Sequence, residues 1–297
     1  MKRTYGILFG LIIVLGVAAY LVLQLPGESS VQSSGEKRLV TYDSASVDKI
    51  EMHTKSSHVV LEKHAGKWMM VEPIQFKADE AEAITAVGKG ASILVSSIVS
   101  SNPQKQPVFQ LDSTATLVRV FEKGNERAAF RVGKAGSSFN ETYVRVDGSN
   151  DVYLATDVLS FIFAKPAKDW RDKTIFKIEK AEIKGARFHY GDTTFALTKQ
   201  DTTWQLDGTP LPGTATEAFL TSLSNFMTDE FIDSAVAVPP RLVCTIEVAG
   251  VQLRFHFNKD SGKYLVQTSG SPQWFEIQSW RATQVLKRKK DFMQSVS

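Results

Sequence analysis

The stretch Leu61-Glu-Lys-His-Ala-Gly-Lys-Trp68 returns later in the chain as Leu197-Thr-Lys-Gln-Asp-Thr-Thr-Trp204. Leucine, lysine and tryptophan stand at the same offsets in both copies. Self-similarity of this kind indicates a repeated structural unit, and it affects the interpretation of every other pattern in the chain. This repeat predicts that one structural module occurs twice in the chain, with the two tryptophans packed in equivalent core positions.

The residues around each echo alternate between apolar and polar side chains, which is the pattern of a half-buried β-strand. In the first half three such runs are joined by short turns, and a helical stretch opens at Asp79 and extends through Ile93 to Ile98. The second half repeats this order. We therefore predict the α+β class, with two duplicated modules that are each an antiparallel sheet packed with helices. The predicted first strands of the two modules are Val47–Lys55, Val59–Lys63 and Lys67–Val71, then Ile183–Tyr190, Thr194–Lys199 and Thr203–Leu206.

The N-terminus has a different character. Lys2 and Arg3 precede the apolar run Ile7–Leu25, which as a helix rising about 1.5 Å per residue matches a hydrocarbon core ~30 Å thick. The run is longer than the ~7–15 apolar residues of a cleaved secretory signal, and flanking positive residues stay cytoplasmic. These features predict a single-pass protein of the cell inner membrane, held in the lipid bilayer through residues 7–25, with its N-terminus cytoplasmic and its bulk periplasmic.

Four segments follow from these patterns. Residues 1–25 are predicted to be a cytoplasmic stub and a transmembrane helix, and residues 26–38, which are rich in serine and glycine, a flexible linker. Residues 39–172 form the first predicted repeat and residues 173–297 the second.

Composition narrows the possible ligands. The chain has 35 Lys and Arg against 32 Asp and Glu, and so small a net charge lacks the basic face of a nucleic-acid-binding protein. The single cysteine, Cys244, lies in an apolar run, which favours a buried thiol. The loop Gly133–Ser138 has its lysine in the wrong place for a phosphate-binding loop and joins two predicted strands. We expect neither nucleic acid nor nucleotide to bind, and no cofactor.

The histidines offer one chemical alternative. His53, His58, Glu62 and His64 are of the types that bind zinc, and a hairpin turn at residues 55–57 would put them on one face of the sheet. Strand residues two apart are spread by about 6.5 Å, so a solvated strand face explains them as well. We therefore predict no metal site, and a metal-dependent hydrolase stays the weaker alternative.

Two segments differ between the copies and are candidates for interaction or junction residues. Trp170, Arg171, Asp172 and Lys173 lie where the two repeats meet, and an Arg171–Asp172 ion pair there would fix the angle between them. Pro73 ends the first meander and has no clear counterpart in the second half. No catalytic residue is predicted.

Several short motifs, taken in order, resemble a known bacterial family. They are Lys67-Trp-Met-Met-Val-Glu-Pro73, Ala78-Asp79, Gln110-Leu-Asp112, Tyr143-Val-Arg145, Val152-Tyr-Leu154 and Trp170-Arg-Asp-Lys173. The chain resembles domain-of-unknown-function family 4340 over roughly residues 45–290. The resemblance implies an envelope protein with one N-terminal anchor and repeated α+β modules. It also implies an association with ABC-type transport systems of the gliding-motility type, and it brings no catalytic residues.

The sequence therefore predicts a non-catalytic, membrane-anchored periplasmic accessory or scaffold protein. Its expected partners are subunits of an inner-membrane transport or envelope complex. The alternative from a different class is a periplasmic module that binds a ligand in a cleft between the two repeats, since clefts between domains are common ligand sites.

Overall fold

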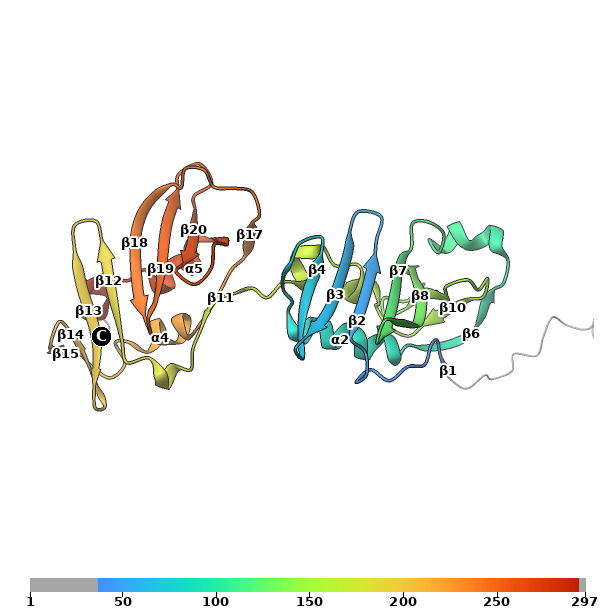
Figure 1. Ribbon diagram of the computed structural model, residues 1–297, viewed down its shortest axis with the longest axis horizontal. Coiled ribbons are helices and arrows are strands. Elements are labelled where there is room, and N and C mark those ends of the chain that lie inside the picture. Colours follow the sequence, from blue (N-terminus) through green and yellow to red (C-terminus); the bar gives the residue numbers. More distant parts are fainter. Residues whose placement is uncertain (1–36, 294–297) are drawn as a thin grey trace, which may run out of the picture. The chain divides into compact units, whose positions relative to one another are not determined.

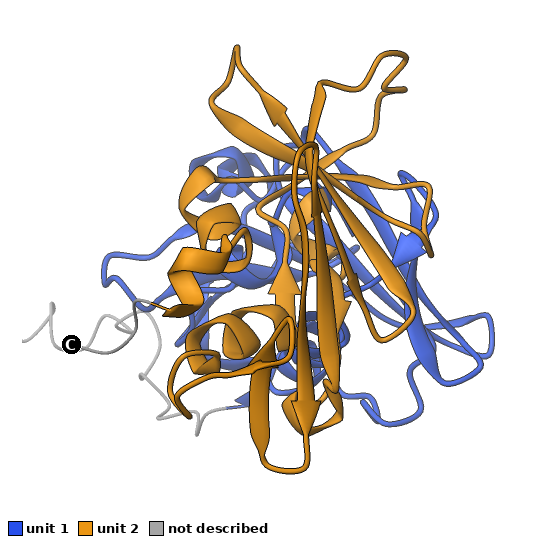
Figure 2. Ribbon diagram, turned by 90° about the vertical axis from the view of Figure 1, so that its left-hand side faces the viewer, with its two compact units in different colours: residues 1–167 blue, residues 168–297 orange. Residues whose placement is uncertain are grey.

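The computed structural model describes residues 37–293, which are drawn with labelled elements in Figure 1. The chain forms two compact units, residues 1–167 and residues 168–297, distinguished by colour in Figure 2. The division falls just before the Trp170–Lys173 segment, whereas the sequence pattern put it within that segment, between Asp172 and Lys173. Lys37 and Arg38, at the end of the predicted linker, form a short strand that pairs with the first sheet.

The first unit is a ten-stranded antiparallel sheet in the order β1-β6-β10-β9-β8-β7-β2-β3-β4-β5. Two meanders, β2 to β5 and β7 to β10, meet where β2 pairs with β7. Helix α2 and strand β6 connect the meanders, and β6 pairs with β10 at the far side. The strands are β1 (Lys37–Arg38), β2 (Lys49–His53), β3 (His58–His64), β4 (Lys67–Glu72), β5 (Phe76–Lys77), β6 (Leu94–Ser100), β7 (Thr116–Glu122), β8 (Asn125–Ala135), β9 (Thr142–Val146) and β10 (Val152–Ala155); the helical segments are α2 (Glu80–Ala91), η1 (Pro103–Phe109) and α3 (Ser160–Phe163).

The second unit has a nine-stranded antiparallel sheet in the order β15-β14-β13-β12-β18-β19-β20-β21-β17. Two further strands, β11 and β16, pair with each other. The strands are β11 (Thr174–Lys177), β12 (Gly185–Tyr190), β13 (Thr194–Gln200), β14 (Thr203–Leu206), β15 (Thr209–Pro210), β16 (Asn225–Met227), β17 (Glu230–Ile232), β18 (Arg241–Val248), β19 (Val251–Asn258), β20 (Lys263–Thr268) and β21 (Trp274–Ile277); the helical segments are η2 (Ala167–Trp170), η3 (Lys180–Glu182), α4 (Glu217–Ser224), α5 (Ser279–Val285) and α6 (Lys289–Met293).

Apart from β1, which has no counterpart in the second sheet, the two large sheets have the same strand order. The meander β2 to β5 corresponds to β12 to β15, β7 to β10 corresponds to β18 to β21, and β6 corresponds to β17. The register agrees as well, since the pairs Lys63 with Trp68 and Met52 with Val59 in the first unit match Lys199 with Trp204 and Phe188 with Phe195 in the second. Trp68 is 2% exposed and Trp204 is 7% exposed, so both tryptophans are core residues.

Side chains alternate between the two faces of each sheet, and one face is buried. In the second unit Phe188 stacks on Phe195 at 4.6 Å between ring centres and contacts Phe219 of α4 at 5.4 Å. In the first unit Phe130 meets Phe163 of α3 at 5.4 Å. We call this the inner face of each sheet and the opposite one the outer face.

Local sequence explains how the main helix of the first unit begins. The carboxylate of Asp79 accepts hydrogen bonds from the backbone N–H groups of Ala81 and Glu82, at 3.0 and 3.2 Å, which caps α2. Gly90 lies near the end of the helix because the Tyr42 hydroxyl, which donates to the Val87 carbonyl at 2.8 Å, occupies the place of a β-carbon. A glycine that looks unfavourable in a helix is therefore required by packing against Tyr42.

The predicted α+β class is wrong. The structure is mostly antiparallel sheet, with 44% of residues in strands and 19% in helices, and the helices are short. The helical stretch expected to run from Asp79 through Ile98 ends at Ala91, and residues 94–100 form strand β6. Pairing of β6 with β10, far along the chain, decides its conformation, and no local period reveals such a contact.

The membrane prediction also needs correction. Among residues 37–293, no helix has both the length and the apolar character needed to cross a membrane. The predicted spanning segment, residues 7–25, lies outside the described residues. The inner-membrane, single-pass localisation with a periplasmic bulk is therefore not supported, and we withdraw it.

Candidate functional site

The predicted junction residues lie at the start of the second unit, and two of them are buried. Trp170 ends the short helix η2 and is fully buried, and Arg171 is 2% exposed. One guanidinium nitrogen of Arg171 donates to both carboxylate oxygens of Asp233, at 2.8 and 2.9 Å. The guanidinium carbon lies 3.6 Å from the ring centre of Phe231. Arg171 therefore holds the edge strand β17 and the residue that follows it.

The expected ion pair between Arg171 and Asp172 does not form. The Asp172 carboxylate instead accepts from the backbone N–H of Thr174 at 3.0 Å, and the Lys173 ammonium bonds to Asp169 at 2.8 Å. Asp172 and Lys173 are thus engaged locally, within the segment that leads into β11. These contacts describe an internal support of the second unit.

Pro73 lies in an exposed loop between β4 and β5. The preceding residue, Glu72, bonds to the Nδ1 atom of His58 at 3.0 Å. The described contacts of this loop give Pro73 no chemical role, and its proposed place in an interaction stays a prediction.

The three histidines of the first unit lie in two separate places. His53 and His58 face each other across β2 and β3 with ring centres 5.2 Å apart, whereas Nε2 of His64 lies 3.6 Å from the Glu62 carboxylate. Within residues 37–293, no three histidine, cysteine or acidic side chains come together to hold a metal ion. The structure thus separates the residues on which the metal-dependent hydrolase was based.

The lone thiol belongs to the core of the second unit. Cys244 is fully buried in β18, and burial raises the pKa of its thiol to about 12. A thiol with so high a pKa is protonated at neutral pH and is a poor nucleophile.

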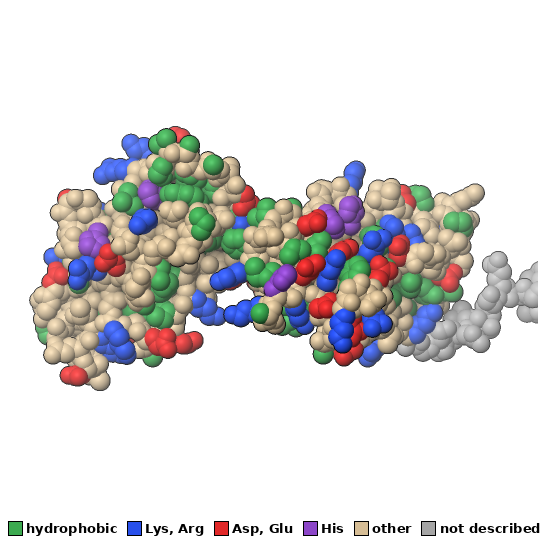
Figure 3. Space-filling model, in the orientation of Figure 1, with side chains coloured by type: hydrophobic (Ala, Val, Ile, Leu, Met, Phe, Trp, Pro, Cys, Tyr) green, Lys and Arg blue, Asp and Glu red, His purple; other side chains and the backbone are tan. Residues whose placement is uncertain are grey.

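The outer face of the first sheet is covered with paired charges. Figure 3 shows basic, acidic and histidine side chains interleaved in front of β2, β3 and β4. The Lys49 ammonium lies 2.7 Å from Glu51 and 3.7 Å from Glu62. Its hydrogen bond to Glu51 raises the pKa of Lys49, although burial acts in the opposite direction. The charged side chains on this face therefore pair with one another.

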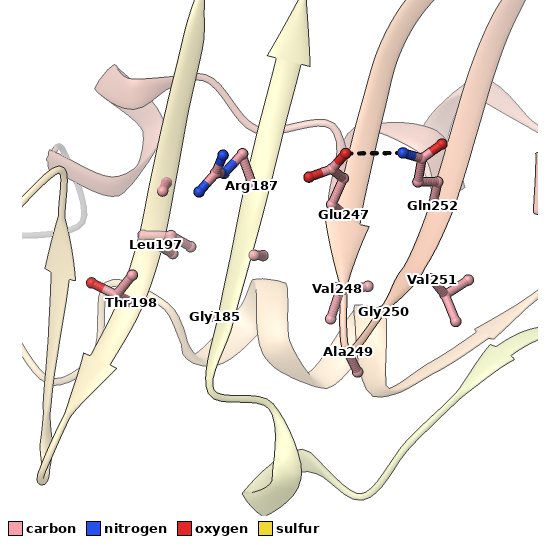
Figure 4. A pocket seen from close by; sticks show the side chains of 12 residues that line it. Gly185, Arg187, Leu197, Thr198, Glu247, Val248, Ala249, Gly250, Val251 and Gln252 are labelled. Carbon is pink, nitrogen blue, oxygen red and sulfur yellow. Dashed lines mark hydrogen bonds between the residues drawn. The ribbon is translucent and has the colours of Figure 1, made fainter. Parts of the chain in front are cut away.

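The outer face of the second sheet contains a hollow instead. The hollow has a volume of about 520 Å³ and crosses β12, β13, β18 and β19 (Figure 4). Backbone of the four strands and the turn Ala249-Gly250 form part of its lining. The polar residues that line the hollow are Arg187, Thr198, Glu247 and Gln252, and the small ones are Gly185 and Ala196.

Glu247 is held in place by its neighbours. Its Oε1 atom accepts from the amide of Gln252 at 3.0 Å, the contact drawn in Figure 4, and its Oε2 atom lies 3.4 Å from Nε2 of His189. Arg187 stands opposite Glu247 in the register of β12 and β18. Among the described residues, no hydrogen bond or ion pair engages the Arg187 guanidinium.

Arg187 and the hollow were not predicted from the sequence. The available signal was the loss of charged residues in the second copy: Thr198 stands where the first copy has Glu62, and Gly185 stands where it has Lys49. The size falls within the range of about 300–1,000 Å³ typical of ligand pockets. We therefore take this hollow as the candidate binding site.

Comparison with known proteins gives one match. The family described as Domain of unknown function (DUF4340) matches residues 68–242, from Trp68 in the first unit into strand β18 of the second. No curated protein and no solved structure matches the chain. Since the matched residues are more than half of the chain, this protein belongs to the DUF4340 family.

Proposed function

We propose that the protein is a non-catalytic accessory or scaffold protein that recognises a partner through the outer face of its second sheet. The observation that carries this proposal is the hollow around Arg187, at a place where the matching first sheet carries the paired charges of Lys49 and Glu62. Its lining combines a cation, an anion held by an amide, a hydroxyl and small side chains, a set suited to recognition by hydrogen bonds.

The strands that carry the hollow form a rigid surface. The hollow lies on the strands of a continuous sheet, and their inner face is fixed by aromatic packing around Phe188. Sites built on such elements are held more precisely than sites on loops. The buried Arg171, by contrast, is committed to Asp233 and Phe231 and supports the unit from within.

The partner class that we propose is a subunit of an ABC-type transport complex, the class that the family resemblance implies. The test is a pull-down of the tagged full chain from cells lysed in mild detergent after brief chemical cross-linking, with mass spectrometry of the recovered proteins. The proposal predicts enrichment of transport subunits over a tag-only control. Recovery of no transport subunit in cross-linked samples would contradict it.

A ligand held between the two repeats, the alternative from the sequence, stays a prediction.

A further inference from the structure

The first unit is the internal copy of the second, and its own side chains fill the outer face at the positions that match the hollow. In the first unit Lys49 pairs with Glu62 across β2 and β3, and Glu51 pairs with Val60 in the same register. The Lys49 ammonium joins the carboxylates of Glu51 and Glu62, and Val60 is 3% exposed beneath them. Charges on this part of the face are balanced within the chain.

The same register positions carry different residues in the second unit. Gly185 pairs with Thr198, and Arg187 pairs with Ala196. A β-carbon at position 185 would lie 2.8 Å from the Leu197 carbonyl oxygen, so the close backbone excludes a side chain there. Replacement of a lysine, a glutamate and a valine by a glycine, a threonine and an alanine leaves the hollow of about 520 Å³.

The positive charge that the hollow offers to a ligand is that of Arg187. The positive and negative residues exchange places between the two units. Glu51 faces Arg119 in the first unit, whereas Arg187 faces Glu247 in the second. One carboxylate oxygen of Glu247 accepts a hydrogen bond from Gln252, and the other lies 3.4 Å from the Nε2 atom of His189, which makes no hydrogen bond. Within the described part of the chain, the guanidinium of Arg187 has no such partner. Because Arg187 is exposed, its guanidinium is available to an anionic group of a ligand.

We propose that the hollow binds the carboxylate of an acidic side chain, an aspartate or glutamate, presented by a partner protein. The Arg187 guanidinium would donate two parallel hydrogen bonds to the carboxylate, the geometry that arginine favours with planar anions. Thr198 lies on the adjacent strand, and its hydroxyl, which points away from Arg187 in Figure 4, would donate a third after rotation of the side chain. The ligand carboxylate takes the role that Glu62 has on the first sheet.

The shape of the site favours a protein over a small molecule. The hollow is an open depression on the face of four strands (Figure 4), whereas small-molecule sites bury some 70–90% of their ligand. A side chain that projects from a larger surface needs only its tip enclosed. This inference rests on the proposed function, because it assumes a partner protein.

The test is a titration of the isotope-labelled full chain, followed by NMR, with a capped tetraglutamate peptide as the probe. Shifts are expected in amides of β12, β13 and β18 and in the side-chain N–H of Arg187. Arg187→Gln and Thr198→Glu should each weaken binding at least about tenfold, a loss of ~1.4 kcal/mol. Thr198→Glu acts by supplying an internal carboxylate, as in the first copy. The matched control is Arg119→Gln, which removes an outer-face arginine of the first unit and should leave binding unchanged.

Two further probes, glutarate and inorganic phosphate, distinguish the sources of the anion. The proposal predicts weaker binding of both than of the peptide. It is overturned if the peptide shifts no residue of the hollow, if Arg187→Gln binds it as well as the wild type, or if glutarate or phosphate binds as tightly as the peptide. Peptide binding without recovery of a transport subunit in the pull-down would contradict the proposed partner class alone. Thermal unfolding of each variant establishes that it is folded.

Discussion

Arg187 stands opposite Glu247 across β12 and β18, in the reverse order of Glu51 and Arg119 at the equivalent place in the first unit. In the first unit the neighbouring Lys49 and Glu62 complete an internal charge cluster. In the second unit their places are taken by Gly185 and Thr198, and a hollow results. The two copies share one architecture, but the outer face of the first sheet is filled by its own side chains and that of the second sheet contains a hollow.

This difference predicts that the hollow tolerates filling. In the double variant Ala196→Val, Thr198→Glu the side chains are those of Val60 and Glu62 in the first copy. We expect a change in the free energy of unfolding of no more than ~1 kcal/mol, because exposed ion pairs contribute little. Urea unfolding measures it. A loss above ~3 kcal/mol would mean that these positions are part of the core and would contradict the description of the hollow.

The two glycines of helix α2 should respond in opposite ways to the same substitution. Gly90→Ala would place a β-carbon against the Tyr42 hydroxyl, and we expect destabilisation by about 1–3 kcal/mol. A β-carbon added at Gly88 would meet nothing within 4 Å, so Gly88→Ala should stabilise by up to ~1 kcal/mol through helix propensity. Thermal unfolding of the two variants compares them. Equal effects would contradict the assigned contact between Gly90 and Tyr42.

Arg171 is predicted to support the second unit from within. Arg171→Met removes both hydrogen bonds to Asp233 and the contact with Phe231, and we expect a loss of about 1–3 kcal/mol. The loss stays small because the Asp233 side chain is 52% exposed and is solvated when its partner is lost.

The control for Arg171 is Lys173→Gln, which breaks the more exposed pair with Asp169 and should cost less than ~0.5 kcal/mol. Hydrogen exchange provides the specific readout, since amides of β17 should lose protection in Arg171→Met before those of β13. Unchanged protection of β17 would refute the supporting role.

Burial of Cys244 predicts an alkaline dependence of stability. Its thiol has a pKa of about 12 in the folded chain, against 9.0 for a thiol in water, so folding favours the protonated form. The stabilisation is therefore fully present below pH ~9 and is lost as pH rises from ~9 towards ~12, with a limiting slope near 1.4 kcal/mol per pH unit. Cys244→Ala should show a shallower decline over this interval in urea unfolding. Identical slopes would show that the thiol does not titrate differently in the folded state.

Some of this architecture was predictable from local patterns. The echo of Leu61–Trp68 in Leu197–Trp204 marks equivalent hairpins, because alternation and tight turns determine short-range strand pairing. Pairings between distant segments were not predictable. Strand β6 continues a helical period but pairs with β10, and Arg171 bonds Asp233 rather than the adjacent Asp172.

The candidate site was hidden for a different reason. A hollow is produced by side chains that are small, and Gly185, Ala196 and Thr198 carry no motif of their own. Their smaller size becomes evident only when they are aligned with Lys49, Val60 and Glu62 of the first copy. The histidines are of a type that binds metal ions, yet backbone spacing on β2 and β3 separates His64 from the pair His53 and His58.

Site-specific photo-cross-linking in cells tests most directly whether the second sheet has become a recognition face. A photoreactive amino acid is placed at position 198 in the hollow or, as the matched control, at position 62 on the first sheet. If the second sheet is a recognition face, position 198 cross-links to an acidic segment of a partner protein, this cross-link is lost when Arg187→Gln is added, and position 62 gives none. No cross-link from position 198, equal cross-links from both positions, or a cross-link that survives Arg187→Gln would contradict it.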